Sequence, residues 1–287
     1  MNKPKTSITS SAVLVEQNIS VWTANKLDRT VTEDMLVAKH AVSGAAQVRK
    51  NLMAGTSDRK NIADYAAGCR LWHNQNTMPW ADKGVRLLPT SLFMEYKRES
   101  NQRLANFNTM VDEFLQNYDN LVAVAGNYMG DLFDASDYPS ADTVAECFDY
   151  RIVFSPVPEA GDFRLDIPQK ELEEVIDGYE ESFNSRLKEA MKEPWNRMHK
   201  LLSTMSNKLD DSGDSKKRYH DSLIDNAVDL CDMLKHMNVT QDPALESARV
   251  QLQKAMKGRD IEGLKEDAHE RYDLKEKVDK ILGGFDW

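Results

Sequence analysis

The residues in this chain with the spacing of a metal site are carboxylates and imidazoles on predicted helices. Glu266 and His269 stand three positions apart, as in helical di-iron proteins, which also require a second such pair and two further glutamates. Asp229, Asp232 and His236 lie on neighbouring turns of another predicted helix. Because a solvated helix face explains both sets more simply, we predict no metal site and no cofactor.

A second set of reactive groups is Cys69 and His73, four positions apart on a predicted helix. A nearby imidazole can lower the pKa of a thiol and make it a nucleophile. The sequence shows no nucleophile elbow, and it holds neither a GxxxxGK[ST] nor a GxGxxG string for nucleotide phosphates. We therefore interpret the pair as a packed cysteine beside a helix-end histidine, and we predict that the protein is not an enzyme.

Two short segments combine cations with an aromatic ring, as in proteins that bind single-stranded nucleic acid by stacking bases on rings. They are the residues Tyr96, Lys97 and Arg98 and the residues Lys216, Lys217, Arg218 and Tyr219. The formal net charge of -10 opposes this function, because non-specific affinity for nucleic acid comes mostly from cations that displace counterions. Solvated helix starts are the simpler interpretation of both segments.

The end of the sequence, Gly283 to Trp287, has two aromatic residues after a diglycine. Phe285, Asp286 and Trp287 form a candidate partner-binding peptide that would insert into a pocket of another protein. The alternative is a tail folded back onto its own helices.

Tryptophans and methionines supply a further candidate, an adaptable groove for a partner, because thioethers repack around varied shapes. The residues concerned are Trp72, Trp80, Trp195, Met191, Met198 and Met205. At helical spacing, such residues more often belong to the core.

Composition and cysteine usage favour a cytoplasmic protein. The hydrophobic fraction is 41% and the charged fraction 29%, which suits exposed helices. Cys69, Cys147 and Cys231 are far apart and odd in number, so we expect buried free thiols in a reducing compartment. The first eleven residues are polar and no stretch approaches the roughly 18 apolar residues of a membrane span, which disfavours secretion and membrane anchoring.

The elements that must position these residues can be read from apolar spacing. Alternation predicts strands over 13–22 and 150–157, the second paired with 162–167 across a turn. Helical spacing predicts helices over 31–42, 60–75, 93–118 and 121–133. Thr30 and Glu33 have the spacing of a capping box, and Ser140 is a candidate N-cap for a short helix.

The spacing of apolar residues changes after Pro168. Apolar residues recur every three or four positions from Leu172 to Leu209, which predicts a long helix with a kink, or two abutting helices, at Pro194. Further helices are expected over 218–237, after the cap Asp242, and over 261–282. The long helix from Leu172 to Leu209 and the helix over 218–237 form a predicted antiparallel pair.

These elements predict a mainly α protein with a small β-sheet, of the α+β class, whose long amphipathic helices form an elongated bundle. We divide the chain into a flexible N-terminus (1–12), an α+β domain (13–167), a long-helix bundle (168–282) and an aromatic tail (283–287).

Several of these segments together resemble an uncharacterised family of bacteriophage and bacterial proteins. They are the strand from Leu14 to Trp22 with Lys26 and Leu27, the run Gly84 to Pro89, Tyr138-Pro139-Ser140, and Phe148 to Pro158. The resemblance covers residues 13–210 and implies a genomic setting beside a MoxR-type AAA+ ATPase and a von Willebrand A-domain protein similar to a cobalt-chelatase subunit. It implies no catalytic residues.

The hypothesis from the sequence is therefore a phage-encoded, non-enzymatic adaptor in the host cytoplasm, with an AAA+ ATPase and a von Willebrand A-domain protein as expected partners. The alternatives are a single-stranded DNA-binding protein and an acidic mimic of DNA that inhibits a host enzyme. The oligomeric state, including a homo-oligomer, stays open.

Overall fold

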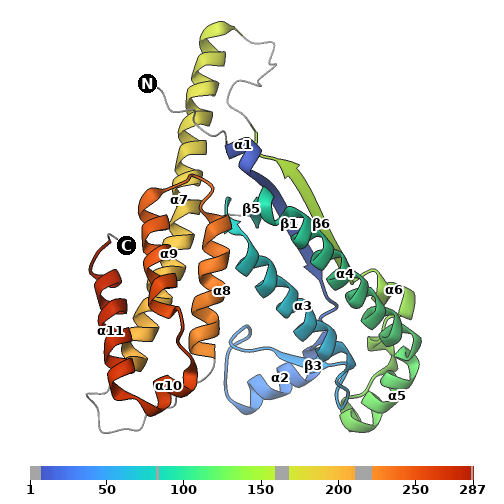
Figure 1. The fold of residues 1–287 in the computed structure, drawn as a ribbon. Helices are drawn as coiled ribbons and strands as arrows, with labels where there is room; N and C mark the ends of the chain where they lie inside the picture. Colours follow the sequence, from blue (N-terminus) through green and yellow to red (C-terminus); the bar gives the residue numbers. More distant parts are fainter. Residues whose placement is uncertain (1–7, 82–83, 159–167, 211–221, 286) are drawn as a thin grey trace. The chain divides into compact units, whose positions relative to one another are not determined.

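The computed structural model describes residues 8–81, 84–158, 168–210, 222–285 and 287 of the chain (Figure 1). It is mainly helical, with one four-stranded and one two-stranded sheet. The predicted α+β class is therefore confirmed. Within the described part of the chain, none of the helices combines the length and the apolar character needed to cross a bilayer.

The chain forms two compact units, each assembled from separate segments. The first unit contains Met1–Glu16, Asn74–Tyr96 and Val153–Trp287, and the second contains Gln17–His73 and Lys97–Ile152. The boundary predicted from the sequence between the α+β domain and the helix bundle lies at Pro168. Pro168 does precede a long helix, but segments before it belong to both units.

The four-stranded sheet has the strand order β4, β5, β1, β6. Its strands are β1 (Ala12–Ser20), β4 (Met78–Pro79), β5 (Val85–Pro89) and β6 (Asp149–Pro156). β1 and β5 run antiparallel, with Ala12 opposite Pro89 and Glu16 opposite Val85. The strands predicted over 13–22 and 150–157 are confirmed, whereas the proposed partner strand over 162–167 lies outside the described residues.

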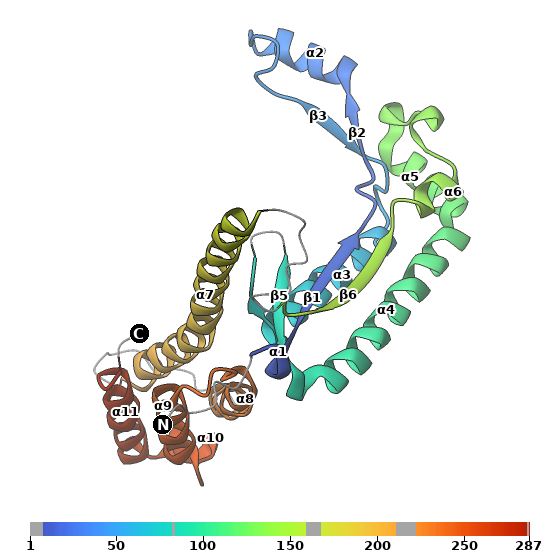
Figure 2. The same cartoon turned by 90° about the horizontal axis from the view of Figure 1, so that it is seen from above.

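Four helices of the first unit pack side by side around an apolar core (Figures 1 and 2). They are α7 (Gln169–Leu209), α8 (Ser222–Met237), α9 (Pro243–Met256) and α11 (Ala268–Leu282). Their apolar positions recur at helical spacing, so one stripe of each helix is buried, including Leu202, Leu234, Leu252 and Val278. The helical pair predicted after Pro168 is confirmed for its described residues.

Helix α7 continues through Pro194 as a single helix, so of the two predicted alternatives, a kinked helix or two abutting helices, the second is wrong. Proline removes one backbone donor, but Pro194 lies on the buried face between Ala190 and Met198. Packing of that face against the neighbouring helices holds the helix together, because most helix stability in proteins comes from tertiary contacts.

The single helix predicted over 261–282 is two helices, α10 (Ile261–Glu266) and α11. Asp267 interrupts it, because its backbone is extended and its carboxylate accepts a hydrogen bond from the amide of His269 at 2.7 Å. An aspartate that caps the next helix ends the previous one.

A second core of the first unit lies beside the sheet. Its buried residues include Leu14, Met78, Trp80, Leu87 and Met237. The short helices α1 (Ile8–Ser11) and η1 (Thr90–Leu92) contact each other in this unit.

The second unit is built mainly from α3 (Asp58–Asn76), α4 (Phe93–Gln116), α5 (Tyr118–Met129) and α6 (Ala141–Ala145). The two 3-10 turns η2 (Gly130–Leu132) and η3 (Ala135–Asp137) follow α5. The core includes Ile62, Phe107, Phe114 and Tyr118. The predicted N-cap Ser140 is confirmed, because its hydroxyl accepts from the amide of Thr143.

The second unit also contains a two-stranded sheet whose strands flank a helix. Its elements are β2 (Asn25–Asp28), α2 (Arg29–Ala38) and β3 (Val48–Asn51). The capping box predicted at Thr30 and Glu33 is wrong, because the N-cap is Asp28, which accepts from the amide of Val31 at 2.9 Å. The helix also ends at Ala38 rather than at the predicted residue 42.

Candidate protein-binding surfaces

The first predicted basic-aromatic segment does not present its ring at the surface. Tyr96 is buried and packs edge-on against Phe154, with ring centroids 6.1 Å apart, and burial raises the pKa of its phenol. Lys97 and Arg98 are exposed on the same helix. A buried ring cannot stack on a base, so only the charges of Lys97 and Arg98 are available to a nucleic acid.

The second predicted segment, Lys216 to Tyr219, lies outside the described residues.

The aromatic tail lies against the long helix α7. The ring of Trp287 is 5.5 Å from that of Trp195 and 5.2 Å from that of His199, and its indole N–H donates to the carbonyl of Leu282 at 2.8 Å. Phe285 packs on Trp195 as well, with centroids 5.8 Å apart. Asp286 lies outside the described residues. This placement agrees with the alternative interpretation, in which the tail folds back onto its own helices. A role of the tail in partner binding stays a prediction.

The two candidate sets of metal ligands, Glu266 with His269 and Asp229 with Asp232 and His236, do not form a site. Glu266 ends α10 while His269 lies in α11, so the three-residue spacing no longer places them on one helix face. Asp232 pairs with Lys235 at 2.6 Å, and the imidazole of His236 contacts the hydroxyl of Ser91 at 2.9 Å. Among the described residues, no three or more His, Cys, Asp or Glu side chains are grouped so that they could hold a metal ion.

The three cysteines are free thiols, but only Cys69 and Cys231 are buried. The expectation that all three are buried is wrong for Cys147, which follows the short helix α6 and is exposed. Burial raises the pKa of Cys231 to about 11, so this thiol is protonated at neutral pH and is a poor nucleophile.

Five of the six tryptophans and methionines of the candidate groove pack in the hydrophobic cores, and Trp72 does not. Trp80, Met198 and Met205 are buried, and Met191 and Trp195 pack against the same clusters. Trp72 lies under the guanidinium of Arg103, whose central carbon is 4.7 Å from the ring centroid.

Sequence reasoning missed a surface on the segment 25–51, which we call the arm. Its two strands pair antiparallel, with Asn25 opposite Asn51 and Asp28 opposite Val48. Thr32 joins the helix to the second strand, since its hydroxyl donates to the carbonyl of Asp28 and accepts from the amide of Val48 at 2.9 Å. The helix between the strands is therefore fixed at its start.

Ion pairs hold the base of the arm to the rest of the second unit. Lys50 pairs with Asp137 of η3, and Lys26 reaches the same carboxylate at 4.0 Å. The hydrogen bond from Lys50 to Asp137 raises the pKa of Lys50 above its ordinary value. Only about a tenth of the Lys50 and Asp137 side chains is exposed, so solvent screens this pair less than a surface pair.

The helix of the arm ends in a Schellman motif. The amide of His40 donates to the carbonyl of Val37 at 3.1 Å, and the amide of Ala41 donates to the carbonyl of Leu36 at 2.9 Å. His40 has a φ of 49°, the left-handed conformation that this motif requires and that glycine usually supplies. The chain is thereby turned away from the helix axis.

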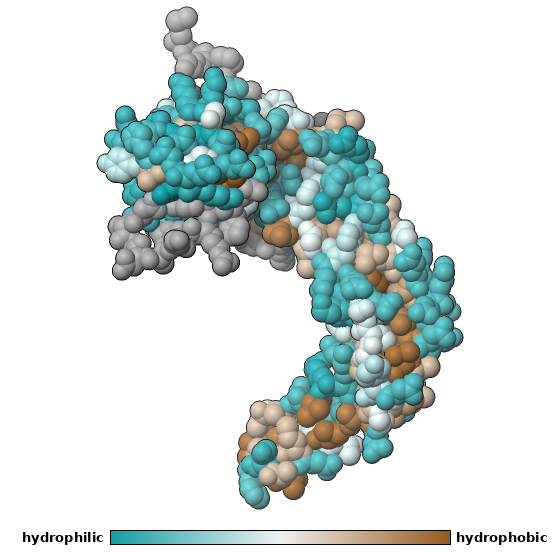
Figure 3. All heavy atoms as spheres, turned by 60° about the horizontal axis from the view of Figure 1, so that its bottom comes forward, coloured by the Kyte–Doolittle hydropathy of each residue, from teal (hydrophilic) through white to brown (hydrophobic). Residues whose placement is uncertain are grey.

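From the last two residues of the helix through this turn, every residue from 37 to 47 is exposed, and we call this segment the tip. Six of its eleven residues are valine or alanine, and it carries Lys39 but no carboxylate. Val37 is 75% exposed and Val42 is 79% exposed. Figure 3 shows apolar residues in brown gathered at the bottom of that view, where the arm lies. A contiguous apolar segment without cover is typical of a protein-binding site.

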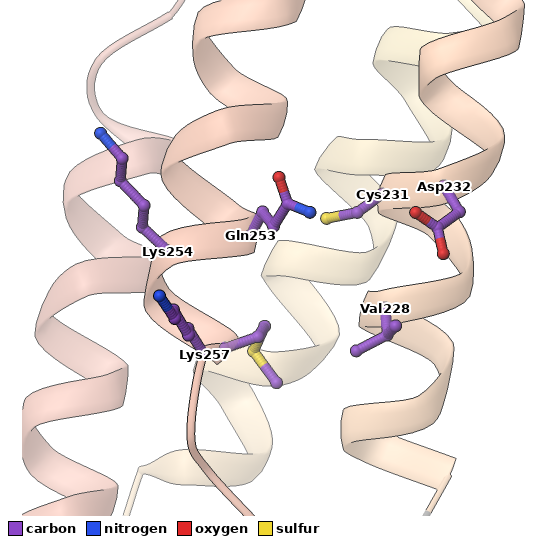
Figure 4. A pocket seen from close by; sticks show the side chains of 7 residues that line it. Val228, Cys231, Asp232, Gln253, Lys254 and Lys257 are labelled. Carbon is purple, nitrogen blue, oxygen red and sulfur yellow. The ribbon is translucent and has the colours of Figure 1, made fainter.

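A second surface lies in the first unit, where a hollow of about 510 Å³ separates α8 from α9. Figure 4 shows Cys231 and Gln253 pointing toward one another across it, with Lys254 and Lys257 extending away from α8. Val228, Asp232 and Met256 complete the lining.

Comparisons of this chain with protein-family models, with curated proteins and with solved structures gave no match.

Proposed function

We propose that this protein is a non-enzymatic adaptor that binds another protein through the tip of its arm. The observation that supports this proposal most is the exposure of the whole tip, with Val37 and Val42 each at least three-quarters exposed. Large apolar side chains in such a position gain free energy when a partner covers them, about 1.5–3 kcal/mol for a fully buried valine.

The chemistry of the tip favours a protein partner over nucleic acid. Six of its eleven residues are valine or alanine, Lys39 is its one lysine or arginine, and it has no phenylalanine, tyrosine or tryptophan. Alanine side chains permit close approach of a partner's backbone, whereas affinity for nucleic acid requires several cations. The partner surface that fits is apolar.

The expected partner follows from the sequence resemblance, which implies a MoxR-type AAA+ ATPase and a von Willebrand A-domain protein. In this proposal, the arm is the element that contacts one of these two proteins. The ion pairs of Lys50 with Asp137 fix the base of the arm, which lowers the entropic cost of binding.

The test is co-purification of the protein with a co-expressed MoxR-type ATPase and the neighbouring von Willebrand A-domain protein. The variant Val37→Asp/Val42→Asp should weaken the complex at least tenfold, because it places two charges in an apolar contact. Leu71→Asp is the matched control, since Leu71 is an exposed residue of α3 in the same unit (59% exposed), and it should leave binding unchanged.

A protein that stays monodisperse and binds neither partner would contradict the proposal, as would a double variant with wild-type affinity. A gel shift with single-stranded DNA at two salt concentrations tests the alternative function. Binding that weakens steeply with salt would favour the nucleic-acid hypothesis.

A further inference from the structure

Helix α9 has a hollow on each side. The hollow toward α8 has a volume of about 510 Å³, and the hollow toward α11 has a volume of about 360 Å³. Lys254 lines both of them, so the two hollows share one lining residue of α9. The second hollow is lined by Gln251, Lys254, Ala255, Lys277, Lys280 and Ile281.

The rims of these hollows carry cations that lack a partner carboxylate. Lys254, Lys257 and Lys280 are exposed and form no ion pair with any described residue. Lys277 is different, because it pairs with Asp273 at 2.7 Å. In a chain with a formal net charge of -10, three unpaired lysines around one helix form a local positive patch.

The one carboxylate that lines the larger hollow is already neutralised. Asp232 accepts a hydrogen bond from Lys235 at 2.6 Å, and this bond lowers the pKa of Asp232. Glu246 is likewise occupied by Arg249 of the same helix, with two hydrogen bonds of 2.6 and 2.8 Å. These carboxylates therefore offer little competition to an anion that approaches the lysines.

The floors of the hollows are apolar. Val228, Met256 and Cys231 line the larger hollow, and Val228 is 46% exposed. Ala255 and Ile281 line the smaller one. The residues that line the two hollows include no aromatic ring, so they offer no surface on which a base could stack.

We infer that this face of α9 binds an acidic segment of a partner protein, with aliphatic side chains in the two hollows and carboxylates against Lys254, Lys257 and Lys280. Charge complementarity identifies this occupant, because the rim is positive and the floor is apolar. An amphipathic helix is the form of peptide that can place aliphatic side chains in the hollows and carboxylates beside the lysines at the same time. This surface lies in the first unit and is separate from the arm in sequence.

The test uses a defined probe, a fluorescein-labelled helical peptide that carries glutamates along one edge and leucines at i, i+3, i+4 and i+7. Fluorescence anisotropy should show saturable binding that weakens several-fold between 50 and 300 mM salt, because exposed charges are screened over about 8–10 Å near physiological ionic strength. Lys254→Glu/Lys257→Glu should weaken binding at least tenfold.

Lys200→Glu is the matched control, because Lys200 is an exposed lysine of α7 outside both hollows, and it should keep wild-type affinity. Both lysines of the double variant are exposed, so its thermal unfolding should match that of the wild type. The inference is overturned if the wild type does not bind the probe, if the double variant binds equally well, or if a peptide with glutamine in place of glutamate binds equally well. Preference for an oligo-dT strand over the peptide at the same lysines would also overturn it.

Discussion

The guanidinium of Arg197, on α7, donates a hydrogen bond of 2.7 Å from Nη2 to the backbone carbonyl of Asn74, in the last turn of α3. The same guanidinium reaches the carbonyl of Thr77 at 3.1 Å and that of Gln75. The carbonyls at the end of a helix have no partner inside it and carry partial negative charge. Arg197 therefore caps α3 from another helix, and Glu193 orients it with a hydrogen bond of 2.8 Å.

The first prediction concerns this cap. Arg197→Met keeps the apolar stem of the side chain but removes the donors, and it should lower the free energy of unfolding by about 2–3 kcal/mol, since hydrogen bonds to charged groups contribute about 1.5–3 kcal/mol each and do not add fully. Urea unfolding measures the change. Lys200→Met, at an exposed position of the same helix, is the control and should cost less than about 0.5 kcal/mol. Equal stability of the two variants would contradict the capping role.

The second prediction concerns Gly55, which has a φ of +78° and lies against the ring of Tyr128. Alanine here meets both backbone strain and a steric clash, so Gly55→Ala should destabilise by more than the roughly 1–2 kcal/mol of the left-handed conformation alone. Gly44→Ala separates the two effects, because Gly44 has a φ of +87° with nothing within 4 Å of an added Cβ.

A double-mutant cycle completes this test. Tyr128→Ala should recover the steric part of the Gly55→Ala cost and leave the conformational part. If Gly55→Ala and Gly44→Ala cost the same amount in thermal unfolding, the contact of Tyr128 with Gly55 has no energetic role.

The third prediction uses the C-terminal end of the arm helix. His40 adopts the left-handed conformation at a φ of 49°, which costs a side-chain-bearing residue about 1 kcal/mol relative to glycine. His40→Gly should therefore raise the free energy of unfolding by about 0.5–1 kcal/mol, measured in urea. A destabilised variant would mean that the imidazole makes a contact that outweighs the backbone strain.

The helices were predictable where one apolar stripe is buried. The periodicity of residues 60–75 and 172–209 is set by packing on one side, and α3 and α7 follow it. The ends of the helices were less predictable where the residue that ends a helix is not one that usually does so. His40 replaces the glycine that normally marks a Schellman motif, and the apolar pattern therefore extended the predicted arm helix to residue 42.

The candidate surfaces were not predictable, because exposure depends on long-range packing. Valine is a residue type common in cores, and nothing local indicates that Val37 and Val42 are exposed. Tyr96 shows the reverse case, since a ring beside Lys97 and Arg98 suggests a surface site but is buried. Lys254 and Lys280 lie on different helices, so only the fold brings them to the same hollow.

The fourth prediction concerns the thiols. Exposed Cys147 should react with Ellman's reagent in the native protein at pH 8, whereas Cys69 and Cys231 should react only after unfolding, because burial blocks the reagent. Rapid native labelling of all three would contradict the placement of the buried pair.

The raised pKa of Cys231 also gives a pH dependence. In the unfolded chain the thiol loses its proton near its ordinary pKa of 9.0, and in the folded chain it does so at about 11. The folded state therefore retains the proton longer, and stability falls as the pH rises from 9 toward 11. The difference between the wild type and Cys231→Ala isolates this effect from that of Tyr118, whose pKa burial raises to about 12. A difference in stability that does not change over this range would contradict it.

The last prediction separates the two interpretations of the aromatic tail. If the tail is part of the first unit, Phe285→Ala/Trp287→Ala should lower the free energy of unfolding by about 1–3 kcal/mol, because each aromatic pair with Trp195 contributes about 0.5–1.5 kcal/mol beyond its buried area. A tail that serves as a plug for a partner gives the opposite result, with unchanged stability but lost affinity for the ATPase or its companion. Measuring unfolding and partner binding on the same variant therefore distinguishes a structural tail from a binding peptide.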